Sequence, residues 1–324
     1  MTRVARVCLV LTLTAAVVPG LAAADERYAL IVSGASGSEK FAESQKTWVS
    51  SLQSTLQKHL GFAADHIIVL SEGAGESDIA NRANVTRTLT ALKPKLTADD
   101  TLLVVLLGHG TYDGTAAKFN LVGPDMESRE WKASLDGIAA RLVFVNTTSS
   151  SFEFVQALSG KNRIVIAATD SSAQKYATVF PQYFIEALTD QAKADNDKNG
   201  RLSVWEAFTY ASQAVKQSFE QKGTLVTERS IIDDNGDGVG KEATATAAGG
   251  DGVLARTTFL DAPPAATSAN AAVAALDKRR IAIEVEIEQL KARKGEMPAG
   301  QYEEEFERLA IELAKISAQI RSAK

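Results

Sequence analysis

Two groups of side chains in this sequence have the types and spacing that chemistry requires. The first is an imidazole between two glycines: His109 follows the uncharged run of residues 101–107 and is flanked by Gly108 and Gly110. Glycines let the backbone turn sharply and leave the ring uncrowded. The second is an acidic stretch of twelve residues, 195–206. The imidazole is suited to proton transfer, and the acidic stretch is suited to a hard cation such as Ca²⁺.

The acidic stretch fits the loop of an EF-hand calcium site at every position. Short oxygen-bearing side chains stand at the first, third and fifth positions, a glycine permits the sharp turn at the sixth, and a glutamate stands at the twelfth. Helical patterns flank the loop, over residues 178–192 and from residue 204 to about 222. A solvated acidic turn is the alternative, but agreement over the whole pattern favours calcium. The predicted ligands are Asp195, Asp197, Asn199, the carbonyl of Arg201, Ser203 and Glu206.

A second acidic stretch, residues 233–240, matches only the first half of this pattern. Asp233, Asn235 and Asp237 stand at the first three ligand positions, but Thr244 takes the place of the bidentate carboxylate. The sequence leaves two interpretations open, a low-affinity or shared calcium site and a polar turn.

His109 needs a partner before it can act as a general base. The only cysteine of the chain is Cys8, so no thiol follows the buried strand predicted at residues 142–145. Hydroxyl groups follow it instead, in residues 146–151. A hydroxyl needs a closely held base that removes its proton during attack, and a carboxylate normally orients that base. Asp113, on the histidine loop, is the candidate for this role; the alternative is that residues 146–151 form a hydrogen-bonded loop capping the next helix.

Alternating apolar runs and helical patterns must position these groups. The predicted strands are residues 28–32, 66–70, 101–107, 142–145 and 163–168. The helical patterns between them are residues 41–60, a segment from Asn84 or Thr86 to about Lys93, and residues 131–139 and 152–158. This alternation predicts a parallel sheet with helices on both faces. A small hairpin is expected at residues 116–122, beside His109.

Two neighbouring parallel strands that end in a His-Gly pair and in a short polar loop resemble the caspase/legumain family of cysteine peptidases (clan CD, C13-type). The resemblance implies a caspase-like three-layer α/β sandwich, with His109 as general base or acid and a cysteine just past the next strand. Aligned with the family pattern, Thr148 stands at the cysteine position and Ser149 follows it. The resemblance covers roughly residues 27–240, including a calcium loop like that of bacterial secreted members.

The N-terminal residues 1–24 have the charged start, apolar centre and alanine-rich cleavage site of a secretory signal peptide. The apolar centre is too short for a good membrane span. Removing this segment takes away Arg3 and Arg6 and no acidic residue, so the formal net charge changes from −5 to −7. We therefore expect an exported, periplasmic or extracellular protein that is mildly acidic, lacks cysteine and does not bind nucleic acid.

The C-terminal part of the chain changes character after the main domain, residues 25–261. An edge strand is expected within residues 253–260, and the composition of residues 262–272 predicts a linker. In residues 273–324, apolar residues recur at spacings of three and four positions on both sides of a Gly/Pro turn. This pattern predicts an antiparallel helical hairpin of coiled-coil type. So small a hairpin should dock on the main domain or pair with another chain, as an oligomerisation or partner-binding arm.

Three functions are compatible with these features. The first is an exported, calcium-binding peptidase homologue that has lost its nucleophile and binds a protein or peptide partner. The second is an active hydrolase in which Thr148 or Ser149 attacks with His109 as base. The third is a structural envelope protein that acts through its coiled coil.

Overall fold

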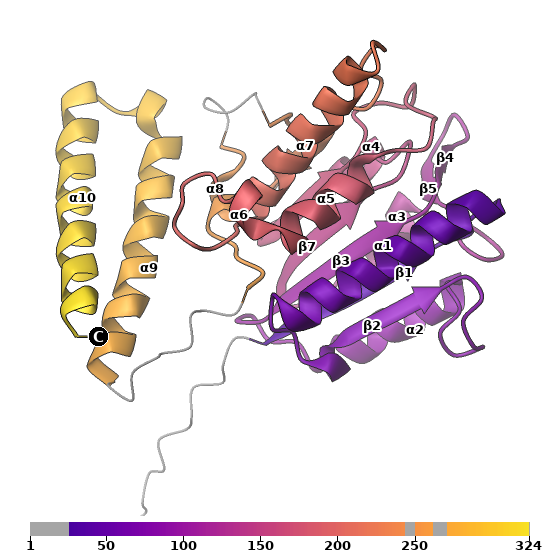
Figure 1. Cartoon of the computed structure of the whole chain (residues 1–324), viewed down its shortest axis with the longest axis horizontal. Coiled ribbons are helices and arrows are strands. Elements are labelled where there is room, and N and C mark those ends of the chain that lie inside the picture. Colours follow the sequence, from indigo (N-terminus) through magenta and orange to yellow (C-terminus); the bar gives the residue numbers. More distant parts are fainter. Residues whose placement is uncertain (1–25, 244–249, 262–270, 324) are drawn as a thin grey trace, which may run out of the picture.

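A computed structural model describes residues 26–243, 250–261 and 271–323. The predicted signal peptide, Thr244 and most of the predicted linker lie outside the described residues. Within them a six-stranded sheet forms the centre of the molecule, and two long helices form a separate hairpin beside it (Figure 1).

The central sheet has the strand order β2-β1-β3-β7-β8-β9. Its first five members are parallel to one another, and β9 is antiparallel to β8. The five strands predicted from the sequence are confirmed. The bounds are β1 Arg27–Ser33, β2 Ile67–Ser71, β3 Thr101–Leu107, β7 Arg141–Asn146, β8 Arg163–Ala167 and β9 Ile231–Asp233.

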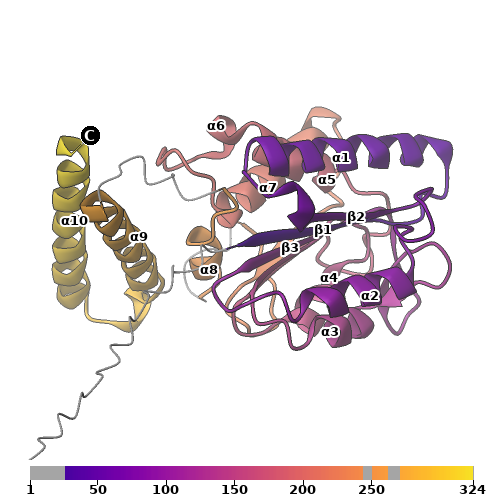
Figure 2. The ribbon, with the colours of Figure 1, turned by 90° about the horizontal axis from the view of Figure 1, so that it is seen from below.

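Helices cover both faces of the sheet (Figure 2). One layer contains α1 (Glu39–Lys58), α5 (Phe180–Thr189) and α7 (Val204–Gln221), and the other contains α2 (Arg82–Leu92), α3 (Ser128–Leu135) and α4 (Phe152–Leu158). Successive strand residues point to opposite faces, so Leu30 and Ile31 belong to different apolar cores. Because both faces are buried, the strands read as continuous apolar runs. The predicted three-layer α/β sandwich with a mostly parallel sheet is therefore confirmed.

The hairpin expected at residues 116–122 is part of a small three-stranded antiparallel sheet. Its strands are β4 (Gly110–Tyr112), β5 (Ala117–Phe119) and β6 (Met126–Glu127). Helix α2 also begins earlier than expected, since Asn81 and neither Asn84 nor Thr86 caps it. The Asn81 side chain accepts a hydrogen bond from the Asn84 backbone N–H at 2.8 Å.

The expected edge strand at residues 253–260 is wrong, because this segment contains the short helix α8 (Val253–Arg256). Its first turn is bound by a distant carboxylate: Asp234 accepts from the backbone N–H groups of Gly252 and Ala255. The sheet edge is instead β9, whose Ile232 exchanges two backbone hydrogen bonds with Lys241. The helical pattern over residues 178–192 is divided between α5 and the short α6 (Gln191–Ala194).

The predicted C-terminal helices are present as α9 (Ala271–Ala292) and α10 (Ala299–Ser322), with the short turn η2 (Lys294–Glu296) between them. We call this pair the hairpin arm. It has its own apolar core, formed by Val273, Ile283, Ile287, Leu290, Leu309, Ile316 and Ile320. None of the helices in the described part of the chain combines the length and the apolarity that a membrane span needs.

A buried carboxylate, Glu228, holds the start of α5. Its two oxygens accept from the backbone N–H groups of Val179 and Phe180, each at 2.8 Å. Burial raises the pKa of Glu228 to about 7, although these two hydrogen bonds oppose the shift.

This raised pKa predicts a pH-dependent stability. The folded state holds the Glu228 proton up to about pH 7, whereas the unfolded chain releases it near its ordinary value. The contribution of Glu228 to the free energy of unfolding should thus fall by about 2.5 kcal/mol between pH 5 and pH 8. Chemical denaturation of wild type and Glu228→Gln over this range measures the difference. The exposed Glu220→Gln on α7 is the control, and an identical pH slope in wild type and Glu228→Gln would contradict the assignment.

Candidate functional site

The loops that follow β3 and β7 leave the sheet side by side, because Leu106 is paired with Asn146 in the register of the two strands. They approach so closely that a side chain at Gly110 would not fit. A Cβ placed on Gly110 would lie 2.6 Å from the Thr148 Oγ1 and 2.1 Å from the Ser149 carbonyl oxygen. The structure therefore brings the His109 loop against Thr148 and Ser149.

The His109 ring is half-buried and contacts the loop that follows β1. Its Nε2 lies 3.0 Å from the carbonyl oxygen of Ser36, and its ring packs edge-on against Phe41 with 4.6 Å between centroids. A carbonyl only accepts, so Nε2 carries the proton in this hydrogen bond and Nδ1 of the neutral ring is left as the basic nitrogen. The group that orients His109 is thus a backbone carbonyl, which sequence reasoning missed because a carbonyl is common to every residue.

Asp113 does not orient the imidazole in this structure. Its carboxylate accepts from the backbone N–H groups of Thr115 and Ala116 and pairs with Lys118 at 2.7 Å. The hydrogen bond from Lys118 and those from the two backbone amides hold the pKa of Asp113 well below its usual range. These bonds close the turn between β4 and β5, a common local use of aspartate.

The two candidate nucleophiles are buried and already bonded to the protein. The Thr148 side chain is fully buried, and its Oγ1 donates to Asn146 Oδ1 at 2.8 Å. The Ser149 Oγ donates to the carbonyl oxygen of Gly110 at 2.9 Å. Among the described residues, no hydrogen bond joins either hydroxyl to His109. In this arrangement neither hydroxyl is bonded to a base that could remove its proton.

The rest of the 146–151 loop is tied to neighbouring strands. The Thr147 Oγ1 donates to the Leu106 carbonyl at 2.7 Å, and the Ser151 backbone N–H donates to the Thr169 Oγ1 at 2.8 Å. Ser151 precedes α4 but makes no side-chain cap to it. The sequence offered a hydrogen-bonded loop that caps the next helix as an alternative to a catalytic loop. The loop is hydrogen-bonded, but its side chains join strand ends and do not cap the helix.

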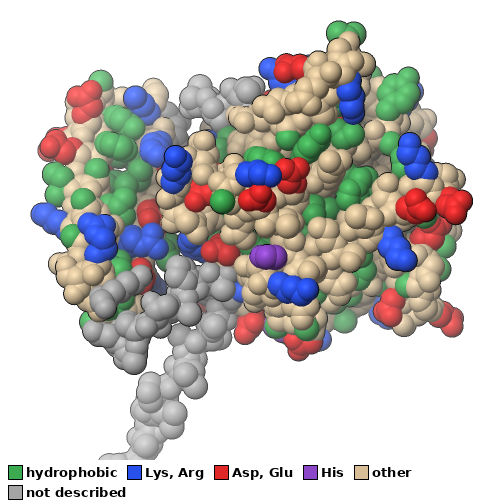
Figure 3. Space-filling model, viewed as in Figure 1, with side chains coloured by type: hydrophobic (Ala, Val, Ile, Leu, Met, Phe, Trp, Pro, Cys, Tyr) green, Lys and Arg blue, Asp and Glu red, His purple; other side chains and the backbone are tan. Residues whose placement is uncertain are grey.

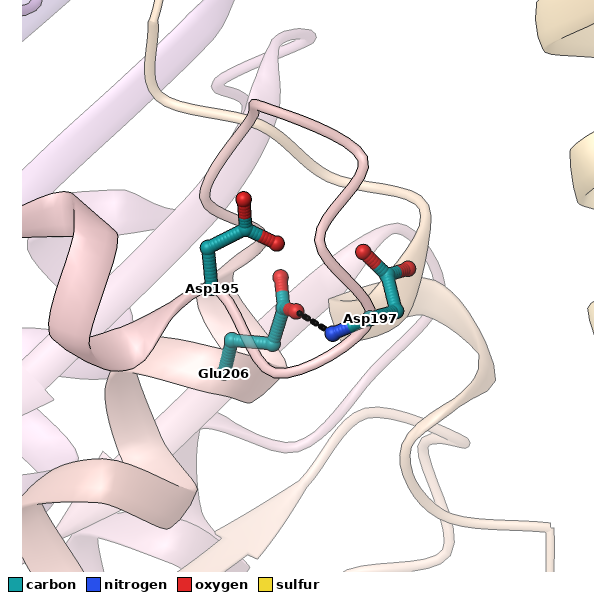
Figure 4. Close-up of side chains that lie close together, drawn as sticks. All are labelled: Asp195, Asp197 and Glu206. Atoms are coloured by element: carbon teal, nitrogen blue, oxygen red, sulfur yellow. Dashed lines mark hydrogen bonds between the residues drawn. The ribbon is translucent and has the colours of Figure 1, made fainter.

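The acidic loop between α6 and α7 brings three carboxylates together (Figure 4). One oxygen from each of Asp195, Asp197 and Glu206 lies within 4.8 Å of the others. The Gly200 backbone has a φ of +80° and donates to Asp195 Oδ2 at 2.9 Å, and Asn199 Oδ1 accepts from the Arg201 N–H. In the part of the chain that the structure describes, no other group of three acidic, histidine or cysteine side chains has this geometry.

Glu206 has a second role at the start of α7. This buried carboxylate accepts from the backbone N–H groups of Ser203 at 2.9 Å and Asn196 at 3.0 Å. Ser203 accepts in return from the Glu206 N–H, and the pair forms a capping box. Its bonds to residues on both sides of the loop draw the ends of the loop together.

The acidic loop is also joined to residues 257–261, which we call the exit segment because it leads toward the hairpin arm. Arg201 binds both carboxylate oxygens of Asp261 and stacks over Phe259 at 3.9 Å. Phe259 forms a β-bridge with Ser203, and the Val204 N–H donates to the Thr258 carbonyl at 2.9 Å.

The second acidic stretch repeats part of the first loop. Asp233 is buried and accepts from the backbone N–H groups of Gly236 at 2.9 Å and Gly238 at 3.0 Å. Asn235 Oδ1 accepts from the Asp237 N–H, as the corresponding side chain does in the first loop. These bonds suit a polar turn and a weak cation site equally.

No protein-family model and no curated protein matches the chain. Solved structures similar to it include the Drosophila initiator caspase Dronc, with 14% identity, a TM-score of 0.45, and coverage of 65% of this chain and 80% of that one. For drICE the identity is 13%, the TM-score 0.40 and the coverage 65% and 87%. For iotapain, a secreted C11 cysteine protease from Bacteroides thetaiotaomicron, the identity is 11% and the TM-score 0.40, with coverage of 65% of this chain and 67% of that one. Similarities of this size assign neither an activity nor a substrate.

Proposed function

We propose that this chain is a caspase/legumain-like protein that has lost its nucleophile and acts by binding a protein or peptide. The observation that carries the proposal is the state of Thr148, which stands where the family has its cysteine. Its hydroxyl is fully buried and donates to Asn146. A nucleophile has to reach a substrate carbonyl and release its proton to a base, and Thr148 is placed for neither step.

The retained imidazole supports descent from a working site. His109 is still held by a strand-end loop and is bonded to Ser36, so its tautomer is fixed although neither Thr148 nor Ser149 is bonded to it. An active hydrolase using Thr148 or Ser149 is the second candidate. It would require either hydroxyl to break a protein hydrogen bond and become exposed before each turnover.

The proposal includes a calcium ion in the 195–206 loop of an exported protein. The donor set supports it, because calcium prefers carboxylate and carbonyl oxygens and three carboxylates converge in this loop. The loop joins α6 to α7 and contacts the exit segment, so an ion there would act as a structural clamp.

A peptidase assay tests the loss of activity. Wild type, His109→Ala and Thr148→Ala should cleave a mixed fluorogenic peptide library at the same background rate, in the presence of calcium. His59→Ala, an exposed histidine variant, is the control, and an active cysteine peptidase verifies the library. Cleavage by wild type and His59→Ala that is lost in His109→Ala would refute the proposal and establish the hydrolase.

A further inference from the structure

The acidic loop and the hairpin arm share a cavity of about 530 Å³. On one side it is lined by Asn196, Asp197 and Asn199 of the loop, and on the other by Ile281, Glu284 and Val285 of α9. We call the described residues 26–243 and 250–261 the body. Figure 3 shows charged side chains of both signs along the junction between the arm and the body. The arm therefore faces, across this cavity, the same loop that carries the three carboxylates.

Arg256 of α8 connects the arm to the helix that supplies the last loop ligand. Its guanidinium stacks over Trp205 at 4.2 Å and pairs with Glu288 of α9 at 3.7 Å. Trp205 immediately precedes Glu206 in the first turn of α7. A displacement of that turn would move the surface on which Arg256 rests, and with it the contact to the arm.

The exit segment supplies a second connection. Arg201 contributes a backbone carbonyl at the seventh loop position, while its side chain binds Asp261, the last described residue before the arm. An ordered loop thus fixes the direction in which the chain leaves the body.

Charge connects the two parts as well. Burial raises the pKa of Glu284 despite the nearby cations Arg280 and Arg201, and the negative charge of Asp197 adds to the shift. Glu284 of the arm and Asp197 of the loop line the same cavity, so their carboxylates lie near enough for their charges to interact. Without a cation the two carboxylates repel one another, and a divalent cation in the loop reverses the sign of that interaction.

We propose that the acidic loop and the hairpin arm are energetically coupled, so that a cation bound in the loop strengthens docking of the arm and the docked arm strengthens cation binding. This coupling rests on the calcium site of the proposed function. Linkage requires the two effects to be equal, and couplings of this kind typically change affinity about 5-fold to 150-fold.

Docking of the arm and the affinity for calcium can both be measured on the full chain carrying Cys8→Ser. One dye is attached to Lys222→Cys of the body and the other to Glu303→Cys of the arm. Calcium titration should change the energy transfer between the dyes, with a midpoint equal to the Kd from calorimetry. Arg256→Ala and Glu288→Gln should reduce this response and weaken calcium binding at least about fivefold. Glu307→Gln, an exposed variant on α10, is the matched control.

The possible failures are distinguishable. If calorimetry detects calcium binding but energy transfer stays constant, or if Glu288→Gln binds calcium as tightly as wild type, the coupling is wrong and the calcium site stands. If calcium produces no heat in the wild-type chain, the site and the coupling fail together. If Asp197→Asn still responds to calcium as wild type does, the cation acts elsewhere and the coupling is wrong.

Discussion

Calcium at one hundred times its Kd should raise the melting temperature of the wild-type chain by about 5–10 °C. A ligand that binds only the folded state at this excess adds about 2.7 kcal/mol, and for a domain of this size 1 kcal/mol corresponds to about 2–4 °C. Asp197→Asn should abolish the rise. Differential scanning calorimetry with calcium and with chelator measures both values.

The contacts in the loop determine which variant gives the clearest result. Asp197 is exposed and bonds only within the loop, so an asparagine should leave the calcium-free melting temperature nearly unchanged. Glu206→Gln should lower the melting temperature even without calcium, because Glu206 is bonded to Asn196 and Ser203 at the start of α7. Asp99→Asn is an exposed control outside the loop. If calcium leaves the wild-type melting temperature where it is, the clamp does not exist.

A cysteine placed at position 148 should be unreactive while the protein is folded. In a Cys8→Ser background, Thr148→Cys should react with a thiol reagent at least about 100-fold more slowly than Thr111→Cys on strand β4, since labelling requires local opening. Thr148 is fully buried and Thr111 is exposed. Absorbance of the released thiolate measures both rates.

Labelling in denaturant provides the control, because both cysteines should then react equally fast. Rapid labelling of folded Thr148→Cys would show that the loop opens readily to solvent. That result would remove the burial on which the assignment of an inactive site depends and would favour the hydrolase.

The parallel strands could be predicted from the sequence because burial on both faces leaves an uninterrupted apolar run. In β1, Leu30 and Ile31 belong to opposite cores, and both had to be apolar. The short strands β6 and β9 could not be found in this way, since two or three residues carry no period and depend on distant partners. Helix α8 was missed for the same reason, because Asp234, which bonds its first turn, lies far away in the sequence.

The candidate site was also predictable only in part: its main residues could be named from the sequence, but their hydrogen-bond partners could not. Glycines around His109 identified the histidine loop, and the resemblance to the caspase/legumain pattern placed Thr148 opposite it. Side-chain chemistry alone could not identify the Ser36 carbonyl as the partner of the imidazole. It also gave Asp113 a role in the site, although local turn bonds and Lys118 already satisfy that carboxylate.

The antiparallel edge of the main sheet limits how copies of this protein can aggregate. Strand β9 has only three residues, and Lys241 of the same chain already exchanges hydrogen bonds with its central residue, Ile232. Exposed, unpaired strand edges are the usual templates for intermolecular β-pairing and amyloid growth. This side of the molecule therefore offers a second copy little free backbone to pair with, which protects the folded protein from fibril formation there.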